Sequence, residues 1–390
     1  MKTILYIHQA AELYGSDKTL LDLVQAIDKK PGFNVIVILP NDGPLKSLLI
    51  KNGIKVLTLP VIKISREVFK PHKLIALLFS IYPLCKRLKK ALGETTIDIV
   101  HSNTLAVLLG AFYAKFNGIK HVWHVHEIIR KPDVVKNAYP LIVNYFSDKV
   151  VFNSKASMNF LTENNEGLKK ISQVNLNAVS REKDFLDKNK RHQIRQELFY
   201  ATEENIVLGL VGRISKWKGQ DLLLKAFSEL NQNYPSLKLV FVGSAPPNQE
   251  YLVEALNKQI KTLKLEYSCK IVPFQEEIWP VWDAIDVGVI PSKEPEPFGL
   301  VALEAMLSKK PLIVAEHGGL LEIVKDGETG YFFKPNDIIS LKNTIEKLVT
   351  NEAALLSFGE AGYKRANKFF SIDKHIHSFV EIYENLEDKK

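Results

Sequence analysis

The sequence predicts an α/β protein made of two Rossmann-like domains, each a parallel sheet covered by helices. Short β-branched runs alternate with amphipathic helical stretches along the whole chain, which is the pattern of parallel sheets. A polar stretch, residues 180–195, interrupts this series before it starts again. The chain has 390 residues, which is long for a single domain. We therefore expect two doubly wound units rather than one very large sheet.

The first half alternates regularly between strands and helices. Its expected helices are residues 18–27, 73–92 and 105–116. Its expected strands are residues 3–8, 34–39, 55–59, 98–102, 121–125 and 149–153. The stretch 180–195 is rich in Lys, Asp and Asn, and we expect a surface linker there that runs into a helix.

The second half repeats the alternation. Its expected strands are residues 206–211, 237–242, 270–272, 287–290 and 312–315. Its expected helices are residues 220–231, 249–263, 276–284 and 300–307, with three more near 337–349, 353–367 and 373–386. Because ligands bind beyond the carboxyl ends of parallel strands, the crevice between the two domains is the expected site.

Composition narrows the class of protein. Hydrophobic residues make up 46% and no apolar run is long enough to span a bilayer. The first apolar run, Ile4 to Ile7, is too short for a signal peptide and fits a first strand. Cys85 and Cys269 are far apart and indicate neither a disulfide framework nor a metal cluster. We expect a cytoplasmic protein.

The charge is uneven along the chain. Residues 1–180 carry 24 Lys and Arg against 13 Asp and Glu, a net charge of +11, and the remainder carries −3. A basic half of this kind either meets an anionic surface or substrate, or is an ordinary solvated face. Charge alone does not decide between these two interpretations.

The segment from Asp286 to Met306 carries the most chemical information. An apolar strand ends at Pro291-Ser292, and a helix is expected to begin near Phe298-Gly299. A helix N-terminus offers unpaired N–H groups to a phosphate, and Gly299 allows close backbone approach. Glu296 lies in the loop before this helix and Glu304 lies inside it, with seven residues between them. Glu304 can accept hydrogen bonds from a ribose, and Glu296 can face a sugar.

Two cations follow the expected strand 206–211. Arg213 and Lys218 leave the carboxyl end of that strand just before a helix that begins near Gly219. Two cations at this place can neutralise a diphosphate leaving group without a metal ion. Lys216 lies between them and is expected to be solvated.

Two segments of the first half are also candidates. Gly15, in Tyr14-Gly-Ser-Asp17, would allow close backbone approach, with Ser16 as the expected N-cap. His124 and His126 end a strand and lie on the same side of it, so a zinc pair is conceivable. No HExxH helix or cysteine partner supports zinc, and we favour His126 as a single functional histidine.

Together these motifs resemble glycosyltransferase family 4, whose members have the GT-B architecture of two facing Rossmann-like domains. The resemblance covers nearly the whole chain and is most specific in its C-terminal half. Residues 151–155 and 318–327 add to it. It implies an acceptor-side domain at residues 1–180, a nucleotide-sugar-binding domain at 181–370, and a last helix, 371–390, that packs back on the first domain.

The resemblance also implies roles for single residues. Arg213 and Lys218 would bind the donor diphosphate, and Phe298, Gly299 and Leu300 would present backbone to phosphate and sugar. Glu304 would hold the ribose, and Pro273 and Phe274 would meet the base through backbone. Gly15 would belong to the donor site. The expected catalytic residues are Glu296 at the donor sugar hydroxyls, His126 near the O6 atom of the transferring sugar, Arg213 and Lys218.

Two positions depart from the family pattern. The first loop reads Tyr-Gly-Ser-Asp where a double glycine is common, so Gly15 stands alone there. Gln275 follows Phe274 at the expected base contact, where glycine is frequent.

Similarity to this family implies retention of anomeric configuration without a metal or other cofactor. No residue stands out as the nucleophile that double displacement needs. A front-face route needs only leaving-group stabilisation and positioning, which Arg213, Lys218 and the Phe298 helix terminus can supply. The chain has no Asp-x-Asp metal motif; Glu294-Pro-Glu296 is its nearest imitation.

Two other functions remain open at this stage. A nucleotide-sugar epimerase of the same architecture would need an acid–base pair and no acceptor, and a sugar- or lipid-binding module would have lost catalysis. The intact Glu296, Arg213 and Lys218 favour a transferase over both. A Rossmann dehydrogenase is not expected because no G-x-G-x-x-G follows a strand.

The stretch 73–92 bears on the acceptor. An apolar run from Leu74 to Cys85 is broken by Pro83, which should kink or restart the helix, and the basic run Lys86 to Lys90 follows. It is either a core helix with a basic outer face or a peripheral contact with anionic lipid. The second interpretation predicts a polyprenyl-linked glycan acceptor at the inner face of the plasma membrane. The function that we expect is transfer of a hexose-type sugar to a glycan or polyprenyl-linked glycan, for surface polysaccharide or glycoprotein glycan synthesis. No nucleic-acid partner is expected.

Overall fold

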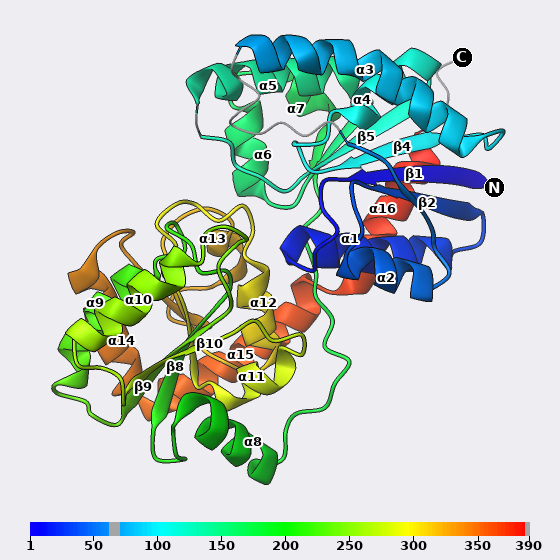
Figure 1. The fold of residues 1–390 in the computed structure, drawn as a ribbon. Helices are drawn as coiled ribbons and strands as arrows, with labels where there is room; N and C mark the ends of the chain where they lie inside the picture. Colours follow the sequence, from blue (N-terminus) through cyan, green and yellow to red (C-terminus); the bar gives the residue numbers. More distant parts are fainter. Residues whose placement is uncertain (62–70, 131, 387–390) are drawn as a thin grey trace. The chain divides into compact units, whose positions relative to one another are not determined.

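The computed structural model describes residues 1–61, 71–130 and 132–386, and no side chains at 71–78, 134 and 135. It divides into two compact units, one of residues Met1–Asn177 with Ile372–Lys390, the other of residues Ala178–Ser371. Each unit is a parallel sheet with helices on its faces (Figure 1). The predicted fold class is therefore confirmed.

The N-terminal unit has a seven-stranded sheet in the order β3-β2-β1-β4-β5-β6-β7. Its strands are β1 (Lys2–His8), β2 (Phe33–Leu39), β3 (Lys55–Thr58), β4 (Ile99–Asn103), β5 (Lys120–Val125), β6 (Lys149–Phe152) and β7 (Ser172–Val174). Six of them match expected strands. The short edge strand β7 was not predicted, because only one of its three residues is apolar.

Alternate residues of these strands build two cores, one on each face of the sheet. Ile4 and Tyr6 of β1 pack with one group of helices, and Leu5 and Ile7 pack with the other. The first group comprises α1 (Gly15–Asp28), α2 (Pro44–Lys51) and α16 (Ile372–Asn385). The second comprises α3 (Pro71–Leu92), α4 (Leu109–Asn117), α5 (Asp133–Phe146), α6 (Lys155–Thr162) and α7 (Glu166–Ile171).

The C-terminal unit has a six-stranded sheet in the order β10-β9-β8-β11-β12-β13. Its strands are β8 (Ile206–Val211), β9 (Leu237–Val242), β10 (Cys269–Val272), β11 (Val287–Ile290), β12 (Leu312–Ala315) and β13 (Gly330–Phe333). Its helices are α8 (Lys188–Ile194), α9 (Gln220–Asn231), α10 (Tyr251–Thr262), α11 (Trp279–Ala284), α12 (Leu300–Leu307), α13 (Leu320–Ile323), α14 (Ile338–Val349) and α15 (Glu352–Phe369). Strand β13 was not predicted.

Both sheets reverse their strand order at one point. In the N-terminal unit the reversal lies between β1 and β4, and in the C-terminal unit it lies between β8 and β11. Such a reversal opens a crevice at the carboxyl ends of the two strands. Most of the predicted site residues follow one of these strands or its neighbour.

The expected linker is anchored to the C-terminal unit. Arg181 donates two hydrogen bonds of 2.7 Å to the carboxylate of Asp283, and both side chains are about 95% buried. Arg195, fully buried, bonds Asp286 at 3.0 Å. Bidentate pairs of this kind fix geometry as well as charge. The stretch 180–195 is thus held by charged side chains that composition alone placed at the surface.

Helix α3 buries apolar residues on one face and exposes basic residues on the other. Ile81 and Cys85 of the apolar run are buried in the core, and so is Leu88 in the basic run, as the interpretation of a core helix with a basic outer face predicts. Leu74 to Leu78 lie outside the described side chains. The helix continues through Pro83 rather than restarting there. The side chains of Phe79 and Tyr82 are 77% and 61% exposed.

Helix α16 lies over a cluster of buried rings in the N-terminal unit. The Tyr383 hydroxyl lies 2.9 Å from that of Tyr6 and 2.8 Å from His101 Nδ1. Within the described residues, His101 Nε2 and both ring nitrogens of His124 have no hydrogen-bond partner. Burial lowers the pKa of both histidines well below the ordinary value. They are therefore neutral in the folded protein.

We predict that the N-terminal unit loses stability as the pH falls from about 6.5 towards 4. Burial lowers the pKa of His121 and of His375 to about 4. Both bind a proton more weakly when folded than when unfolded, so acid favours unfolding. One such shift corresponds to on the order of 3 kcal/mol. Melting temperatures across this pH range test it, and a His121→Gln variant should show a weaker pH dependence. A flat profile would contradict it.

Candidate functional site

Lys218 and Glu296 meet in the C-terminal unit at the strand-order reversal. Lys218 follows β8 and Glu296 follows β11, and the Lys218 Nζ atom lies 2.6 Å from Glu296 Oε1. The Ser292 hydroxyl donates a second hydrogen bond, of 2.5 Å, to the same oxygen. Both carboxylate and serine are buried. The structure therefore brings together two predicted site residues that are 78 positions apart.

A glycine makes this meeting possible. Gly219 precedes α9 with a φ of +79°. A Cβ atom there would lie 2.0 Å from the carbonyl oxygen of Pro291, at the end of β11. Only glycine allows this backbone contact. This contact holds the loop that carries Lys218 close to the loop that leads to Glu296.

Two further glycines, Gly318 and Gly319, pack against the backbone of the loop that carries Glu296. The Gly319 N–H donates a 2.8 Å hydrogen bond to the Glu296 carbonyl oxygen. A Cβ at Gly318 would lie 2.4 Å from that oxygen, and one at Gly319 would lie 2.6 Å from the Cα of Phe298. His317 bonds the Ser292 carbonyl at 2.8 Å. The residues from 317 to 319 thus hold the loop that carries the carboxylate.

Helix α12 begins where the sequence predicted it. Gly299 is its N-cap, with a φ of +110°, and Leu300 is its first residue. The Phe298 side chain is buried and packs 6.1 Å from the Phe370 ring, so only its backbone faces the helix terminus. The first N–H groups of a helix lack partners inside it and point outward along the axis. This terminus can therefore receive a phosphate.

Glu304 lies in the same helix and is 8% exposed. Its Oε2 atom accepts a 3.2 Å hydrogen bond from the Trp282 indole. This contact orients the carboxylate, and a carboxylate can accept about four hydrogen bonds in all. The arrangement can hold a vicinal diol.

Arg213 follows β8 in the same loop as Lys218, and the residues expected at the base, Pro273 and Phe274, follow β10. The Arg213 side chain is exposed, and its carbonyl accepts a 2.9 Å bond from Gln220. The Phe274 N–H donates to Ser244 Oγ at 3.1 Å, and the Pro273 carbonyl accepts from Gln275 at 3.1 Å. Two of the backbone groups expected to meet a base are thus engaged within the protein.

His126 belongs to a buried polar network in the N-terminal unit. Its Nε2 atom lies 3.0 Å from Asn103 Oδ1, at the end of β4. Asn103 Nδ2 lies 3.0 Å from Nδ1 of His8, at the end of β1. His8 Nε2 lies 2.6 Å from Asp17. Burial, followed by the neighbouring His8 and His375, lowers the pKa of His126 to about 3. Its imidazole is therefore neutral.

The first loop differs from expectation in one respect. Gly15 is exposed and begins α1, so Ser16 lies inside the helix and is not its N-cap. Asp17 caps the helix instead by accepting a 2.9 Å bond from the Tyr14 N–H. The same carboxylate bonds His8. The sequence interpretation missed His8, Asp17 and Asn103, although two of them are polar residues at the ends of adjacent parallel strands.

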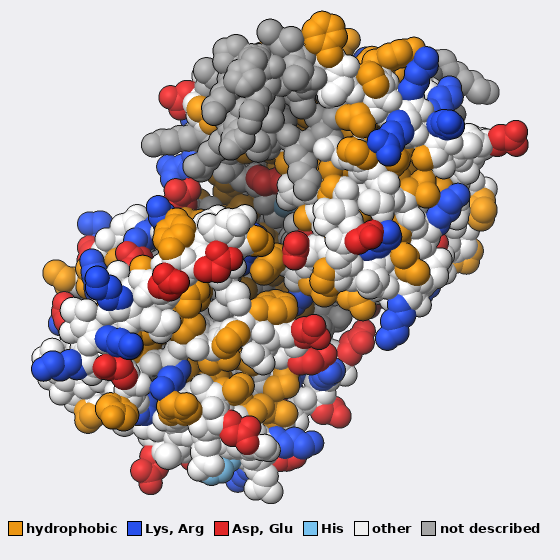
Figure 2. Space-filling model, viewed as in Figure 1, with side chains coloured by type: hydrophobic (Ala, Val, Ile, Leu, Met, Phe, Trp, Pro, Cys, Tyr) orange, Lys and Arg blue, Asp and Glu red, His pale blue; other side chains and the backbone are white. Residues whose placement is uncertain are grey.

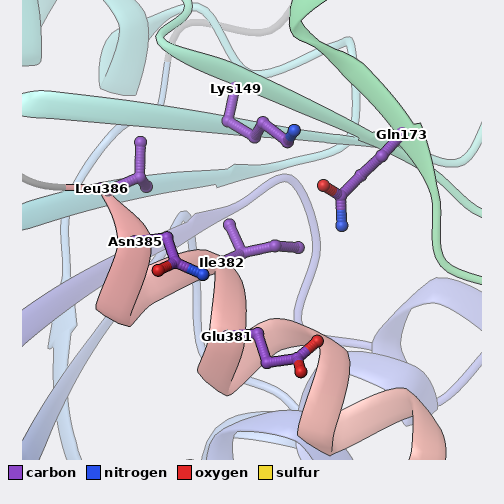
Figure 3. A pocket seen from close by; sticks show the side chains of 6 residues that line it. All are labelled: Lys149, Gln173, Glu381, Ile382, Asn385 and Leu386. Carbon is purple, nitrogen blue, oxygen red and sulfur yellow. The ribbon is translucent and has the colours of Figure 1, made fainter.

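A pocket of about 230 Å³ lies elsewhere in the N-terminal unit (Figure 3). Lys149 and Gln173 reach it from β6 and β7. The other lining residues come from the end of α16, namely Glu381, Ile382, Asn385 and Leu386. Lys149 begins its strand, so this pocket lies at the amino ends of the strands and contains none of the predicted site residues.

Two further findings concern metals and membranes. Among residues 1–61, 71–130 and 132–386, no three His, Cys, Asp or Glu side chains are grouped so that they could share a metal ion. None of the helices in the described part of the chain has both the length and the apolar character that crossing a bilayer requires.

Family comparisons agree with this architecture. Residues 190–365 match the family model of glycosyl transferases group 1, and residues 14–172 match that of Glycosyltransferase Family 4. The crystal structure of HepE from Anabaena in complex with UDP-glucose covers 99% of this chain and is covered completely by it. The two are 26% identical, with a TM-score of 0.85.

Two curated relatives add to these matches. An uncharacterized glycosyltransferase of Methanocaldococcus jannaschii is 29% identical over 326 residues, which is 82% of this chain and 83% of that protein. The capsular polysaccharide biosynthesis glycosyltransferase CapM of Staphylococcus aureus is 29% identical over 200 residues. That match covers 50% of this chain and 49% of CapM, so the chain matches about half of CapM's length.

The two parallel-sheet units with these strand orders, together with these matches, are those of the GT-B class of enzymes. This chain belongs to the GT-B superfamily and is a glycosyltransferase.

Proposed function

We propose that this protein is a retaining, metal-independent member of glycosyltransferase family 4 that transfers a hexose from a UDP-sugar. The acceptor is a glycan or a polyprenyl-linked glycan at the cytoplasmic leaflet, for surface polysaccharide synthesis. The UDP-glucose complex of HepE supports the donor class, and the likeness to CapM supports the pathway class. Both curated relatives reported above are named as glycosyltransferases, which favours a transferase over an epimerase or a binding module.

The contact between Lys218 and Glu296 carries the proposal. In a nucleotide sugar the diphosphate and the sugar share one bridging oxygen, so their binding groups must be neighbours. Lys218 for the diphosphate and Glu296 for the sugar lie 2.6 Å apart at the ends of adjacent parallel strands, and so meet this requirement. Arg213 and the α12 terminus extend the phosphate side, and Glu304 extends the ribose side.

The reaction follows from these groups. The bond between the anomeric carbon and the phosphate oxygen breaks, and its electrons leave with the diphosphate. Lys218, Arg213 and the α12 amides stabilise that charge. The acceptor hydroxyl attacks from the same face and gives its proton to the departing phosphate oxygen. Glu296 holds the sugar hydroxyls and so fixes the orientation of the sugar, and attack on the face that the diphosphate leaves retains the anomeric configuration.

A ligand screen tests the donor. UDP and UDP-hexoses at about 100 times their Kd should stabilise the fold by about 2.7 kcal/mol, whereas GDP and ADP should not. The protein with UDP-hexose and water should release UDP slowly, and EDTA should change neither result. Failure of every nucleotide to shift the melting temperature contradicts the donor site. Loss of activity with EDTA, restored by magnesium or manganese, contradicts the metal-independent mechanism.

One face of α3 supports a lipid-side acceptor. Phe79, Tyr82 and Pro83 lie on this face, and Lys86, Arg87 and Lys90 continue it at helical spacing. All six are exposed. Figure 2 shows basic side chains gathered over the C-terminal half of α3, next to apolar ones. Aromatic rings beside cations are typical of helices that lie in the headgroup region of a membrane.

We predict that the protein binds anionic vesicles in a salt-dependent manner. Each cation of α3 contributes about 1 kcal/mol near an anionic surface. Co-sedimentation should therefore be strong with anionic vesicles at low salt and weak with neutral vesicles or at high salt. Lys86→Glu with Lys90→Glu should abolish it. Equal binding to both vesicle types, or none to either, would favour a soluble acceptor.

The control variant changes the net charge of the protein by the same amount, but at a different place on its surface. Lys29 and Lys30 are exposed at the end of α1, on the opposite face of the sheet from α3. Reversing both charges should leave most of the vesicle binding intact. An equal loss in both double variants would mean that net charge, and not the α3 face, governs binding.

A further inference from the structure

Three buried side chains connect the first turn of α1 to His126, which is itself half-buried. The chain of contacts runs from Asp17 through His8 and Asn103, with atom separations of 2.6, 3.0 and 3.0 Å. His8, Asp17 and Asn103 are 0%, 3% and 1% exposed. The three come from β1, α1 and β4, which meet at the strand-order reversal of the N-terminal unit. They were not among the predicted site residues.

The contacts have a direction. Asp17 only accepts hydrogen bonds, so His8 must carry a proton on Nε2. Asn103 Nδ2 can only donate, so the Nδ1 atom of His8 is an acceptor. The other end of the same amide, Oδ1, only accepts, and His126 must therefore carry its proton on Nε2. Each contact fixes the next one.

We propose that Asp17, His8 and Asn103 are positioning residues that set the tautomer of His126, leaving Nδ1 to accept a hydrogen bond from a hydroxyl of the donor sugar. This rests on the proposed function in one respect, that His126 meets the sugar. A lone pair at Nδ1 selects a hydroxyl and repels a carboxylate. The network therefore favours a hexose over a uronic acid as the transferred sugar.

The first test needs no substrate. The chain has ten histidines, and 15N NMR of the histidine-labelled protein reports the protonation of each ring nitrogen. His126→Gln and His8→Gln variants assign the signals. We expect Nε2–H and a bare Nδ1 on both rings. The Asn103 carbonyl lies 3.3 Å from His8 Nδ1, so a proton on that nitrogen is the alternative. Its detection, or an Nδ1–H form of His126, overturns the proposal.

The second test uses variants of Asn103. Asn103→Leu removes both polar ends, and His126 should become a mixture of tautomers with kcat/KM lowered about tenfold, the effect of one hydrogen bond. Asn103→Asp keeps an acceptor for His126 Nε2–H and should restore that tautomer and part of the activity. An Asn103→Leu protein with an unchanged His126 tautomer overturns the proposal.

Two controls separate positioning from stability and from the proposed function. Asn175, another buried amide of the same unit, bonds the His375 carbonyl at 2.9 Å, and Asn175→Leu should leave the His126 tautomer unchanged. Transfer from UDP-hexose should exceed transfer from UDP-uronate in the wild type. A protein with the expected tautomer and no transferase activity would contradict the proposed function and leave the network intact. Preference for the uronate would overturn the sugar selection alone.

Discussion

Turnover should fall about 10²–10³-fold when Glu296 is replaced by Ala, and by a similar factor in Lys218→Ala. Loss of one electrostatic group that stabilises a transition state costs ~2.7–4 kcal/mol. Lys218 would lose its contact with the leaving diphosphate, and Glu296 its contact with the sugar hydroxyls. Both are expected to act on kcat more than on binding of free UDP, because their effect is largest when the charge separates.

The ion pair adds a stability effect that must be separated from catalysis. Side-chain exposures of 14% for Lys218 and 5% for Glu296 mean that removing one charge leaves the other poorly solvated. Glu296→Gln should cost less stability than Glu296→Ala, because its amide oxygen still accepts from Ser292. Combining Glu296→Gln with Lys218→Met removes both charges together. This double variant should melt near the wild type and still lack turnover.

Lys216 supplies the matched control for the cation. It lies in the same loop, two residues before Lys218, and is exposed. Its Nζ atom lies 5.9 Å from the centre of the Tyr251 ring. Lys216→Ala should keep near-wild-type turnover. If Glu296→Ala and Lys218→Ala also kept it, the site would be wrongly assigned.

The strands were predictable where they form short runs rich in apolar residues. The β1 sequence, KTILYIH, is buried on both faces, as expected of a central parallel strand. Two edge strands escaped notice: β7 has one apolar residue among three, and β13 is a run of only four residues that begins with glycine. Their pairing with β6 and β12 is a tertiary effect that local patterns do not contain.

The C-terminal site was predictable to the extent that its motif is local. Glu296, Glu304 and Gly299 lie within nine residues of one another, so their spacing indicates a loop and a helix. The N-terminal network is different, because His8, Asp17 and Asn103 come together only through the pairing of β1 with β4. A search for polar residues that end buried strands would have found His8 and Asn103. Asp17 would still have been read as a helix cap.

The interpretation of residues 73–92 as a membrane contact was partly wrong because it used the order of residues in the sequence and not their positions around the helix. An apolar run and a basic run in sequence do not reveal which residues share a helix face. Ile81, Cys85 and Leu88 repeat every three to four positions and face the core. Phe79 and Tyr82 fall on the opposite face with the cations. The helical spacing, applied residue by residue, would have made this division.

Gly219→Ala should be as damaging to turnover as loss of Lys218 itself, although Gly219 carries no functional group. A Cβ atom would lie 2.0 Å from the Pro291 carbonyl oxygen, and no real Cβ contact is that short. The Lys218 loop would have to move by about 1 Å, and a misplacement of that size can cost about 10²-fold in rate. The φ of +79° adds about 1–2 kcal/mol of strain for alanine.

Gly53→Ala separates the strain from the displacement. Gly53 has nearly the same φ, +81°, but a Cβ there would meet nothing within 4 Å. This variant should therefore lose about 1–2 kcal/mol of stability and keep its turnover. Gly219→Ala should lose both stability and turnover, and release of UDP from UDP-hexose together with the melting temperature measures the two effects. If Gly219→Ala behaved like Gly53→Ala, the backbone contact between residues 219 and 291 would not control the distance between Lys218 and Glu296.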